Sequence, residues 1–246
     1  MKKNNNKKKI IYFFVGIILF IAIWSFISLK INSEIIFPSI DKIFLDLINI
    51  ISQKDFYSNL LYTFIRVIVT FVLSFLLAIT LGIIAGIFKS VRYILMPIIN
   101  FIRTIPTIPL ILIAVLWFNN NLVPIFVSLF VIFPIIYDAV VNGIINIDKN
   151  LIEMSNSYNV SFKNQLITLY IPSIKPYILT SISQSMGMTW KSVLASEIIT
   201  LPTLGLGTKL YESHLYLNTV SLFAYCLIAI IFNIIFEIIM RLQNDL

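Results

Sequence analysis

Charged side chains are scarce in this chain, since Asp, Glu, Lys and Arg together make up 12% of its 246 residues. A soluble domain carries about twice that fraction. Hydrophobic residues reach 59%, and the mean hydropathy is +0.96. A chain this apolar cannot cover its surface with polar groups, so the composition excludes an ordinary soluble domain and indicates a membrane protein.

Cysteine and histidine are nearly absent, with only Cys226 and His214. One thiol cannot form an internal disulfide, and one imidazole without a second ligand does not make a metal site. The phosphate-binding pattern Gly-x4-Gly-Lys-Ser/Thr is also missing, because Gly207-Thr208-Lys209 has the residues in the wrong order. We therefore expect no metal, no cofactor and no catalytic residues, and no ATP hydrolysis by this chain alone.

Six apolar stretches are long enough to cross a bilayer, which takes about 20 residues each. The predicted spans are Ile10 to Leu29, Tyr57 to Phe88, Tyr93 to Phe118, Leu122 to Val141, Ile174 to Ile199 and Val220 to Met240. The first follows several lysines, as a secretory signal would. Its length and the lack of a small-x-small cleavage site before Lys30 favour a retained anchor. The expected fold is an all-α integral membrane protein with six transmembrane helices.

The net charge of +7 is best explained by topology. With a cytoplasmic N-terminus, 12 of the 18 basic residues fall on the inner side: Lys2, Lys3, Lys7, Lys8, Lys9, Lys89, Arg92, Arg103, Lys149, Lys163, Lys175 and Arg241. This bias satisfies the positive-inside rule and places both termini in the cytoplasm. It predicts a multi-pass protein of the bacterial plasma (inner) membrane, with lipid and not nucleic acid as its surroundings.

Residues 1–56 are predicted to form an N-terminal anchor helix and an outer amphipathic linker, and residues 57–246 the membrane core. The linker begins at about residue 30, and its apolar residues after Pro38 recur at helical spacing: Ile40, Ile43, Phe44, Leu47, Ile48 and Ile51. Such a pattern is typical of a helix lying at the membrane surface.

A polar passage in the second half of the chain interrupts the apolar runs, from Glu153 to Pro172. Asp148 is placed to cap a short helix whose one face would hold Leu151, Ile152, Met154, Ser155 and Tyr158. Asn159 is expected to adopt a left-handed backbone conformation, which asparagine tolerates better than most residues. We expect Ser161 to cap a second helix that runs to Tyr170, and Pro172 to break the chain before the next span.

This passage resembles the EAA loop of permease subunits of ATP-binding cassette (ABC) importers. That loop reads Glu-Ala-Ala, three residues, Gly, nine residues, Ile, one residue, Leu-Pro. Glu153 and Pro172 match, Leu169 and Ile171 are conservative exchanges, and Asn159 takes the place of the glycine. Met154 and Ser155 depart from the pattern. The resemblance predicts a coupling loop at about residues 148–172, with Glu153, Met154, Ser155, Tyr158, Asn159 and Pro172 meeting the ATPase subunit.

Residues 37 to 240 also resemble one branch of the binding-protein-dependent (MetI-like) permeases, which carries nitrate, sulfonates, taurine or pyrimidine precursors. The matching elements, in order, are Phe37-Pro38-Ser39, Thr63-Phe64-Ile65-Arg66-Val67, Gly82 with Gly86, Arg103-Thr104-Ile105-Pro106 with Pro109, Trp117-Phe118, Phe133-Pro134, Trp190, Ser196-Glu197 and Gly205-Leu206-Gly207. Their order and spacing carry the resemblance. It implies a type I ABC-importer fold with residues 57–246 as the permease core.

Residues within the predicted spans that carry charge or break helices are candidates for the transport pathway or its gating: Arg66, Arg103, Pro106, Pro109, Trp190 and Glu197. Charges inside a membrane need an interior, a partner or an interface. For Arg66, pairing with Glu197 and snorkelling to the headgroups are both open. Pro106 and Pro109 are expected to free backbone carbonyls that must be satisfied inside protein or at a water-filled cavity.

The resemblance implies a transport subunit, not an enzyme, that forms the pathway of an ATP-driven importer. Its partners would be ATPase subunits, an extracytoplasmic solute-binding protein and a second permease copy, as a homodimer or a heterodimer. The solute itself stays open among sulfonate, nitrate, taurine and pyrimidine-precursor types. The alternative is an ion-coupled secondary transporter, which would be expected to carry buried acidic relays and an internal repeat.

Overall fold

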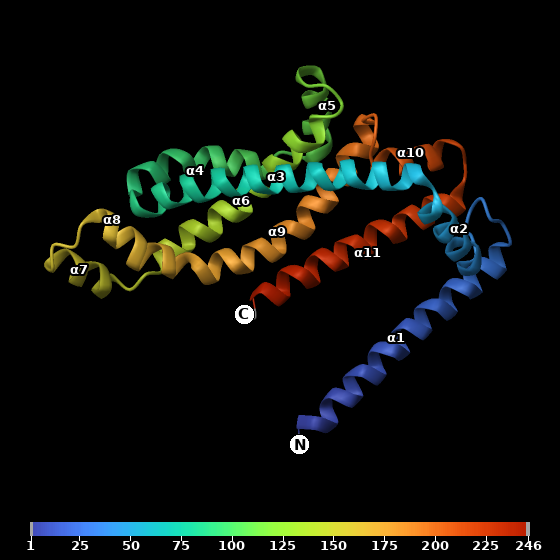
Figure 1. Ribbon diagram of the computed structural model, residues 1–246, viewed down its shortest axis with the longest axis horizontal. Coiled ribbons are helices and arrows are strands. Elements are labelled where there is room, and N and C mark those ends of the chain that lie inside the picture. The colour runs from blue at the N-terminus through green and yellow to red at the C-terminus, as the bar shows by residue number, and fades with distance from the viewer. Residues whose placement is uncertain (1, 245–246) are drawn as a thin grey trace. The chain divides into compact units, whose positions relative to one another are not determined.

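The computed structural model describes the backbone of residues 2–244 and the side chains of residues 11–239 (Figure 1). The five N-terminal lysines, Met240 and Arg241, which the span and topology predictions use, lie outside the described side chains. The elements in order are α1 (Lys2–Ile31), α2 (Ile40–Ser52), α3 (Lys54–Ile87), α4 (Lys89–Thr104), α5 (Thr107–Trp117), α6 (Val123–Ile145), α7 (Lys149–Ser157), α8 (Phe162–Gln165), a π-helical turn η1 (Leu166–Tyr170), α9 (Ile171–Thr200), α10 (Leu206–Leu215) and α11 (Thr219–Asn244). The protein is therefore all-helical, as predicted, over the part described.

Within residues 2–244, four helices are long and apolar enough to cross a membrane: α1, α3, α6 and α11. A fifth span arises if the bent pair α4 and α5 crosses together. The predicted span from Ile174 to Ile199 lies inside α9, which is long enough to cross a membrane but too polar to qualify by composition. The six-span arrangement thus stays a prediction that depends on α9.

The predicted span from Tyr93 to Phe118 is not one straight helix. It consists of α4 and α5, whose axes differ by 99° across a break at Ile105 and Pro106. Pro106 is the N-cap of α5, and Pro109 lies in its first turn, where backbone N–H groups have no partner within the helix. Both prolines therefore stand where a helix tolerates them, and the expectation of one continuous helix over this span is wrong.

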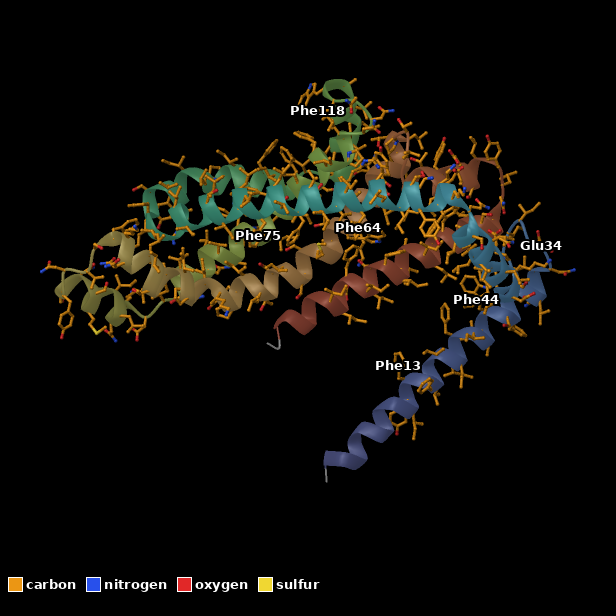
Figure 2. All side chains as sticks on the ribbon, in the orientation of Figure 1. Phe13, Glu34, Phe44, Phe64, Phe75 and Phe118 are labelled. Carbon is orange, nitrogen blue, oxygen red and sulfur yellow. The ribbon has the colours of Figure 1, made fainter. Side chains whose placement is uncertain are left out.

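The chain divides into two compact units, residues 1–58 with 209–229 and residues 59–208 with 230–246. In the first unit, α1 exposes its apolar side chains along its whole described length, as Phe13 illustrates in Figure 2. The Trp24 ring packs on Phe37 and Phe223 at centroid distances of 4.4 and 5.3 Å, and its Nε1 donates to the Pro38 carbonyl at 3.1 Å. The predicted linker helix is confirmed as α2, which buries Ile43 and Ile50.

The second unit is built around α6, which packs most extensively on α9 and also contacts α4 and α5. Gly82 and Gly86 of α3 allow a close helix approach, because a Cβ at either would lie 2.8 Å from Cβ of Val140 or Ile144 on α6. Gly143 of α6 in turn faces the backbone of α9. These small residues let the backbones of neighbouring core helices approach each other closely.

The passage between α7 and α9 departs from prediction at Pro172. The chain stays helical from Phe162 through η1 into α9, so the proline does not break it. Pro172 falls in the first turn of α9, directly after the π-helical turn, whose wider backbone ring accommodates the missing N–H. The Ser173 hydroxyl donates to the Leu169 carbonyl at 2.6 Å, which gives that backbone oxygen a partner where the helical hydrogen-bond pattern changes. Ser161 stands at the predicted N-cap position but makes no side-chain cap bond.

Candidate functional site

The predicted coupling loop has a well-defined backbone at both ends of α7. Oδ1 of Asp148 accepts the N–H of Asn150 at 2.9 Å, which confirms the predicted N-cap. At the other end, Val160 N–H donates to the Ser155 carbonyl and Asn159 N–H to the Asn156 carbonyl, both at 3.0 Å. These two bonds are the Schellman pattern that closes a helix through a left-handed residue.

Asn159 occupies that left-handed position with φ of 51°, which confirms the predicted conformation. Gln165 holds the following turn, since its Nε2 donates to Oδ1 of Asn156 at 2.9 Å and to the Val160 carbonyl at 3.1 Å. The Ser157 hydroxyl bonds the Glu153 carbonyl at 2.9 Å. The loop is therefore organised by its own polar side chains.

The predicted apolar face of α7 is divided by the structure. Ile152 and Ser155 are half-buried, and Ile152 packs on the core around α6. Leu151, Met154 and Tyr158 are exposed, with Tyr158 at 78%. Their spacing of three and four residues places them along one side of the helix. Glu153 is also exposed, so α7 presents a small apolar stripe with a carboxylate beside it.

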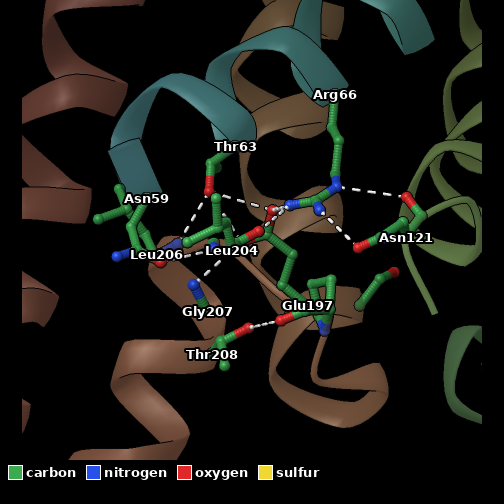
Figure 3. Close-up of polar contacts among 12 residues, drawn as sticks. Asn59, Thr63, Arg66, Asn121, Glu197, Leu204, Leu206, Gly207 and Thr208 are labelled. Atoms are coloured by element: carbon green, nitrogen blue, oxygen red, sulfur yellow. Dashed lines mark hydrogen bonds and ion pairs between the residues drawn. The ribbon is translucent and has the colours of Figure 1, made fainter. Parts of the chain in front are cut away.

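The far end of α9 holds a cluster of buried polar groups around Glu197 (Figure 3). Nη1 of Arg66, on α3, lies 2.6 Å from Oε1 of Glu197 and also donates to the Leu204 carbonyl at 2.7 Å. The Thr63 hydroxyl lies 3.0 and 2.9 Å from the two carboxylate oxygens. Gly207 N–H donates to Oε2 at 3.0 Å. The pairing that the sequence left open is thus present in the structure.

Two asparagines extend this cluster. Asn59 Oδ1 accepts the N–H of Gly205 at 2.9 Å. Asn121, in the loop between α5 and α6, accepts Arg66 Nε at its carbonyl and Nη2 at its Oδ1, at 3.3 and 3.2 Å. We define the Glu197 cluster as the following residues: Asn59, Thr63, Arg66, Asn121, Glu197, Leu204, Gly205, Leu206 and Gly207. It joins α3, the α5–α6 loop, α9 and the start of α10.

Gly205 and Gly207 are required by the close fit of this cluster. A Cβ on Gly205 would lie 2.7 Å from Oε2 of Glu197, and one on Gly207 would lie 2.5 Å from Cβ of Glu197. The chain reaches this loop through Leu201, which caps α9 with a left-handed φ of 48°. Only residues without a side chain let the loop backbone approach the carboxylate so closely. The Gly-Leu-Gly element therefore has a steric explanation.

The Glu197 cluster is suited to holding elements together and not to reacting. Its carboxylate is fully buried, and a guanidinium, a hydroxyl and a backbone N–H balance its charge. Paired and hydrogen-bonded charges of this kind avoid the cost of an isolated buried ion. Arg66 and Glu197 thus form an ion pair that fixes α3 to one end of α9, opposite the end that continues into α8 and α7 (Figure 1).

The remaining candidate residues lie in other places. Arg103, near the end of α4, forms an ion pair with Asp138 of α6, and both side chains are about half exposed. Trp190 is buried, and its ring lies 5.3 Å from that of Phe236. The structure therefore brings together only Arg66 and Glu197 among the predicted pathway residues.

Three adjoining cavities follow the exposed side of α9, and we call them together the α9 groove. Their volumes are about 350, 240 and 380 Å³. The first and second share Ile135, the second and third share Met188, and the first and third share Thr180 and Gln184. Arg103 and Asp138 line the second cavity, and Lys191 and Glu237 line the third. A groove of this length provides a polar surface along a helix of the core.

Sequence reasoning missed the α9 groove, although a usable signal was present. Thr180, Gln184, Met188 and Lys191 recur at spacings of four, four and three, which is the period of one helix face. All four are exposed, whereas Ser181, Ser185 and Thr189 on the packed side are buried. Asn59 and Asn121 carried no comparable signal, because their roles depend on contacts with residues far away in the sequence.

Comparison with known proteins gives the family. The relatives include a putative ABC transporter permease of Methanocaldococcus jannaschii, 26% identical over 77% of this chain and 73% of the relative. A putative aliphatic sulfonates transport permease of Escherichia coli is 29% identical over 58% of this chain and 56% of the relative. The taurine transport system permease of Escherichia coli is 24% identical over 85% and 78%.

The family model of binding-protein-dependent transport system inner membrane components matches residues 78–245. This match includes α6, the predicted coupling loop, α9 and Glu197. The chain belongs to the family of binding-protein-dependent transport system inner membrane components, which are multi-pass permease subunits of ABC transporters.

Proposed function

We propose that this chain forms the translocation pathway of an ATP-driven importer and receives a small solute from an outer binding protein. The observation that carries this proposal is α7. It is a short helix fixed by an N-cap and a Schellman closure, and it presents Leu151, Met154 and Tyr158 without cover from the described chain. An exposed apolar stripe on a rigid helix fits insertion into a cleft of a partner. The partner proposed is the ATPase subunit.

The link between this helix and the membrane core supports coupling. From Phe162 the chain runs helically through η1 into α9, so α7 and α8 are attached to the helix that bears the α9 groove. A displacement of α7 by ATP-driven closure of the ATPase pair would therefore be passed directly to α9. Closure then favours one of two pathway arrangements, because the ATPase dimer binds them with different affinity.

A second permease copy is proposed to complete the pathway. Lys191, Thr180 and Gln184 are exposed on α9 in a single chain, and such polar side chains are costly when they face lipid. A partner related by a two-fold axis would place two such grooves around a shared, water-filled passage. The proposed solute is of the sulfonate, nitrate, taurine or pyrimidine-precursor type, which accords with relatives named for sulfonate and taurine transport.

The rival hypothesis, an ion-coupled secondary transporter, receives less support. Such a protein needs acidic groups within the membrane that exchange ions during transport. Glu197 is enclosed by Arg66 and Thr63, and Asp138 is paired with Arg103. Both carboxylates are therefore neutralised by a neighbouring guanidinium within the chain, which is unfavourable for binding and releasing a coupling ion.

Reconstitution tests the proposal directly. The purified chain in liposomes should neither hydrolyse ATP nor accumulate solute. Addition of its cognate ATPase subunit should give ATP hydrolysis, and addition of the liganded binding protein should raise that rate and start uptake. Saturable, gradient-driven uptake by this chain alone would contradict the proposal and support the secondary transporter.

The six-span topology can be tested by labelling single cysteines in a Cys226→Ser background. Because α9 is the span that composition leaves undecided, positions on both sides of it are decisive. A cysteine near Lys163 should react only after the membrane is opened, and one near His214 should react from outside. Equal labelling of both positions from outside would mean that α9 does not cross.

A further inference from the structure

The surface of α2 differs around the helix axis (Figure 2). Ile43 and Ile50 are the buried residues of this helix, and at about 100° per residue they fall on one side of it. Phe44, Ile48 and Ile51 are exposed and lie on a second side, roughly 120° away. The third side is exposed and, apart from Leu45, polar: Asp41, Lys42, Asn49 and Ser52. The apolar residues that recur at helical spacing in the sequence are thus divided between two sides.

Hydrogen bonds hold α2 against the start of α11, which belongs to the same compact unit. The Ser221 hydroxyl donates to Oδ2 of Asp46 at 2.7 Å. Just before α2, the Ile35 carbonyl accepts the hydroxyl of Thr219 at 2.6 Å. These contacts fix the rotation of α2 about its axis, so the side that bears Phe44 stays on the surface of the unit.

The exposed apolar side of α2 continues the surface of α1. The two helices contact each other, and α1 buries none of its apolar stretch from Ile11 to Ile31. Such a helix has hydrocarbon around it when it crosses a membrane. Phe44 and Ile48 are 56% and 60% exposed, which is unfavourable in water for neighbouring large apolar side chains. The medium that covers α1 therefore fits this side of α2 as well.

Trp24 indicates the level of the membrane surface in this unit. It lies two turns before the end of α1 at Ile31, and its Nε1 donates to the Pro38 carbonyl at 3.1 Å, just before α2. Tryptophan is enriched where hydrocarbon meets the headgroups, because its ring is apolar and its N–H is polar. We therefore expect the first turn of α2 at headgroup level.

The direction of α2 follows from the length of its two exposed sides. Phe44 and Ile51 are two turns apart, or about 10 Å along the axis. The polar side extends from Asp41 to Ser52, over the same part of the helix. A helix along the membrane normal would have lipid at one end and water at the other. Apolar and polar sides that run along the whole helix instead fit an axis parallel to the membrane surface.

We propose that α2 is a lipid-binding helix in the plane of the membrane surface. Phe44, Ile48 and Ile51 lie among the first carbon atoms of the phospholipid acyl chains, and Asn49 faces the headgroups and water. Burial of apolar area holds the helix there. Headgroup charge adds little, because Lys42 is already paired with Glu34. In the predicted topology this surface belongs to the outer leaflet, and the role is independent of ATP-driven import.

The accessibility of spin labels measures which medium meets each side of α2. Single cysteines are introduced as Phe44→Cys, Ile48→Cys and Asn49→Cys in a Cys226→Ser background, and the labelled full-length chains are reconstituted in phosphatidylcholine vesicles. Oxygen concentrates in hydrocarbon, whereas a nickel chelate stays in water. We expect the oxygen-to-nickel accessibility ratio at Phe44 and Ile48 to exceed that at Asn49 by about fivefold, at depths of about 5–10 Å. Leu19→Cys in the exposed α1 is the reference for hydrocarbon.

Two other patterns would overturn the proposal. High nickel accessibility at Phe44 and Ile48 would mean that this side of α2 faces water. Low accessibility to both reagents would mean that a second copy of the chain covers it, since the vesicles contain no other protein. The labels are measured again after addition of the ATPase subunit and the binding protein, and the ratio should stay the same. Loss of oxygen access at that point would make this side a docking surface for a protein partner instead.

A charge placed on the apolar side gives an independent test. Ile48→Asp should lower the oxygen-to-nickel ratio of a label at Phe44 by about twofold or more, because a carboxylate one turn away draws water to that side. Asn49→Asp is the control, since it adds the same charge on the polar side and should leave the ratio unchanged. Ile48 and Asn49 are both exposed, so neither substitution removes a buried contact. Equal ratios in the two variants would contradict a lipid-facing side of α2.

Discussion

The two ends of α9 differ in how exposed their surroundings are and in which contacts hold them. At the α7 end, side chains with no cover from the described chain are held in place by local bonds, most of them within ten residues in sequence. At the other end, the centre of the Glu197 cluster is buried, and the cluster joins residues more than fifty positions apart. In the proposed function, the first end offers a surface to a partner, and the second fixes helices to one another. This difference fits the proposed coupling, in which a displacement at the α7 end is passed along α9 to the helices that its other end holds.

The largest expected effect tests the anchored end. Arg66→Met should destabilise the protein by about 3–5 kcal/mol, because it leaves the buried Glu197 carboxylate without its guanidinium. The double variant Arg66→Met/Glu197→Leu removes both charges and should recover part of that loss. Thermal unfolding in detergent with a matched double-mutant cycle gives the coupling energy. Strictly additive effects of the two single substitutions would show that the two side chains do not stabilise each other.

A smaller effect is expected at the glycines of the same cluster. Gly205→Ala and Gly207→Ala should each cost about 1–3 kcal/mol, as overpacking usually does, because the added methyl groups meet Glu197 at 2.7 and 2.5 Å. Gly16→Ala in α1 is the matched control, since nothing lies within 4 Å of its added Cβ. Unfolding midpoints of the three variants give the comparison. An equal shift for Gly16→Ala and Gly207→Ala would remove the steric explanation.

The sequence predicted the α7 end better than the Glu197 end for a physical reason. Asp148 as N-cap and Asn159 as left-handed residue depend on neighbours within the same short segment, so composition and spacing indicate them. Arg66 and Glu197 were recognised as charges that need partners, but their pairing depends on how α3 and α9 pack. The same limit explains the wrong expectation for Pro172, whose surroundings depend on a π-helical turn.

The helix content of the chain was predictable because long apolar runs allow few other solutions in a membrane. The bend between α4 and α5 was not, since Pro106 and Pro109 fit either a kinked span or two separate helices. The polarity of α9 is a second feature whose meaning depends on packing. Its Ser and Thr residues lower its hydropathy, yet many of them pack inside the core and bond carbonyls one turn back, as Thr189 does with Ser185 at 2.7 Å.

A smaller, local effect is expected at Asn159. Asn159→Gly should keep the loop intact, because glycine adopts the left-handed conformation without strain. Asn159→Val should cost about 1–2 kcal/mol locally, since a β-branched residue resists positive φ. Hydrogen exchange of the α7 amides reports the loss, and the amides of α6 provide the internal control. Equal protection of α7 in the Gly and Val variants would contradict a role for the left-handed turn.

The smallest expected change in stability belongs to the exposed face of α7. Met154→Asp should alter the unfolding free energy by less than about 0.5 kcal/mol, as exposed substitutions usually do. Its control is Asn156→Asp, which adds the same charge about 200° around the helix. The new carboxylate of that control still accepts the bond from Gln165. Both variants should therefore unfold like the wild-type chain, and a large shift in either would mean that the substituted side chain is itself needed for the fold.

The most direct test of the account measures how much ATPase subunit co-purifies with these two variants and with Glu153→Lys. If α7 is the docking helix, Met154→Asp and Glu153→Lys should lose most of the bound ATPase subunit and the ATP hydrolysis stimulated by the binding protein, whereas Asn156→Asp should keep both. Full association and full transport by Met154→Asp and Glu153→Lys would contradict the central claim that the ATPase subunit couples to this permease through α7.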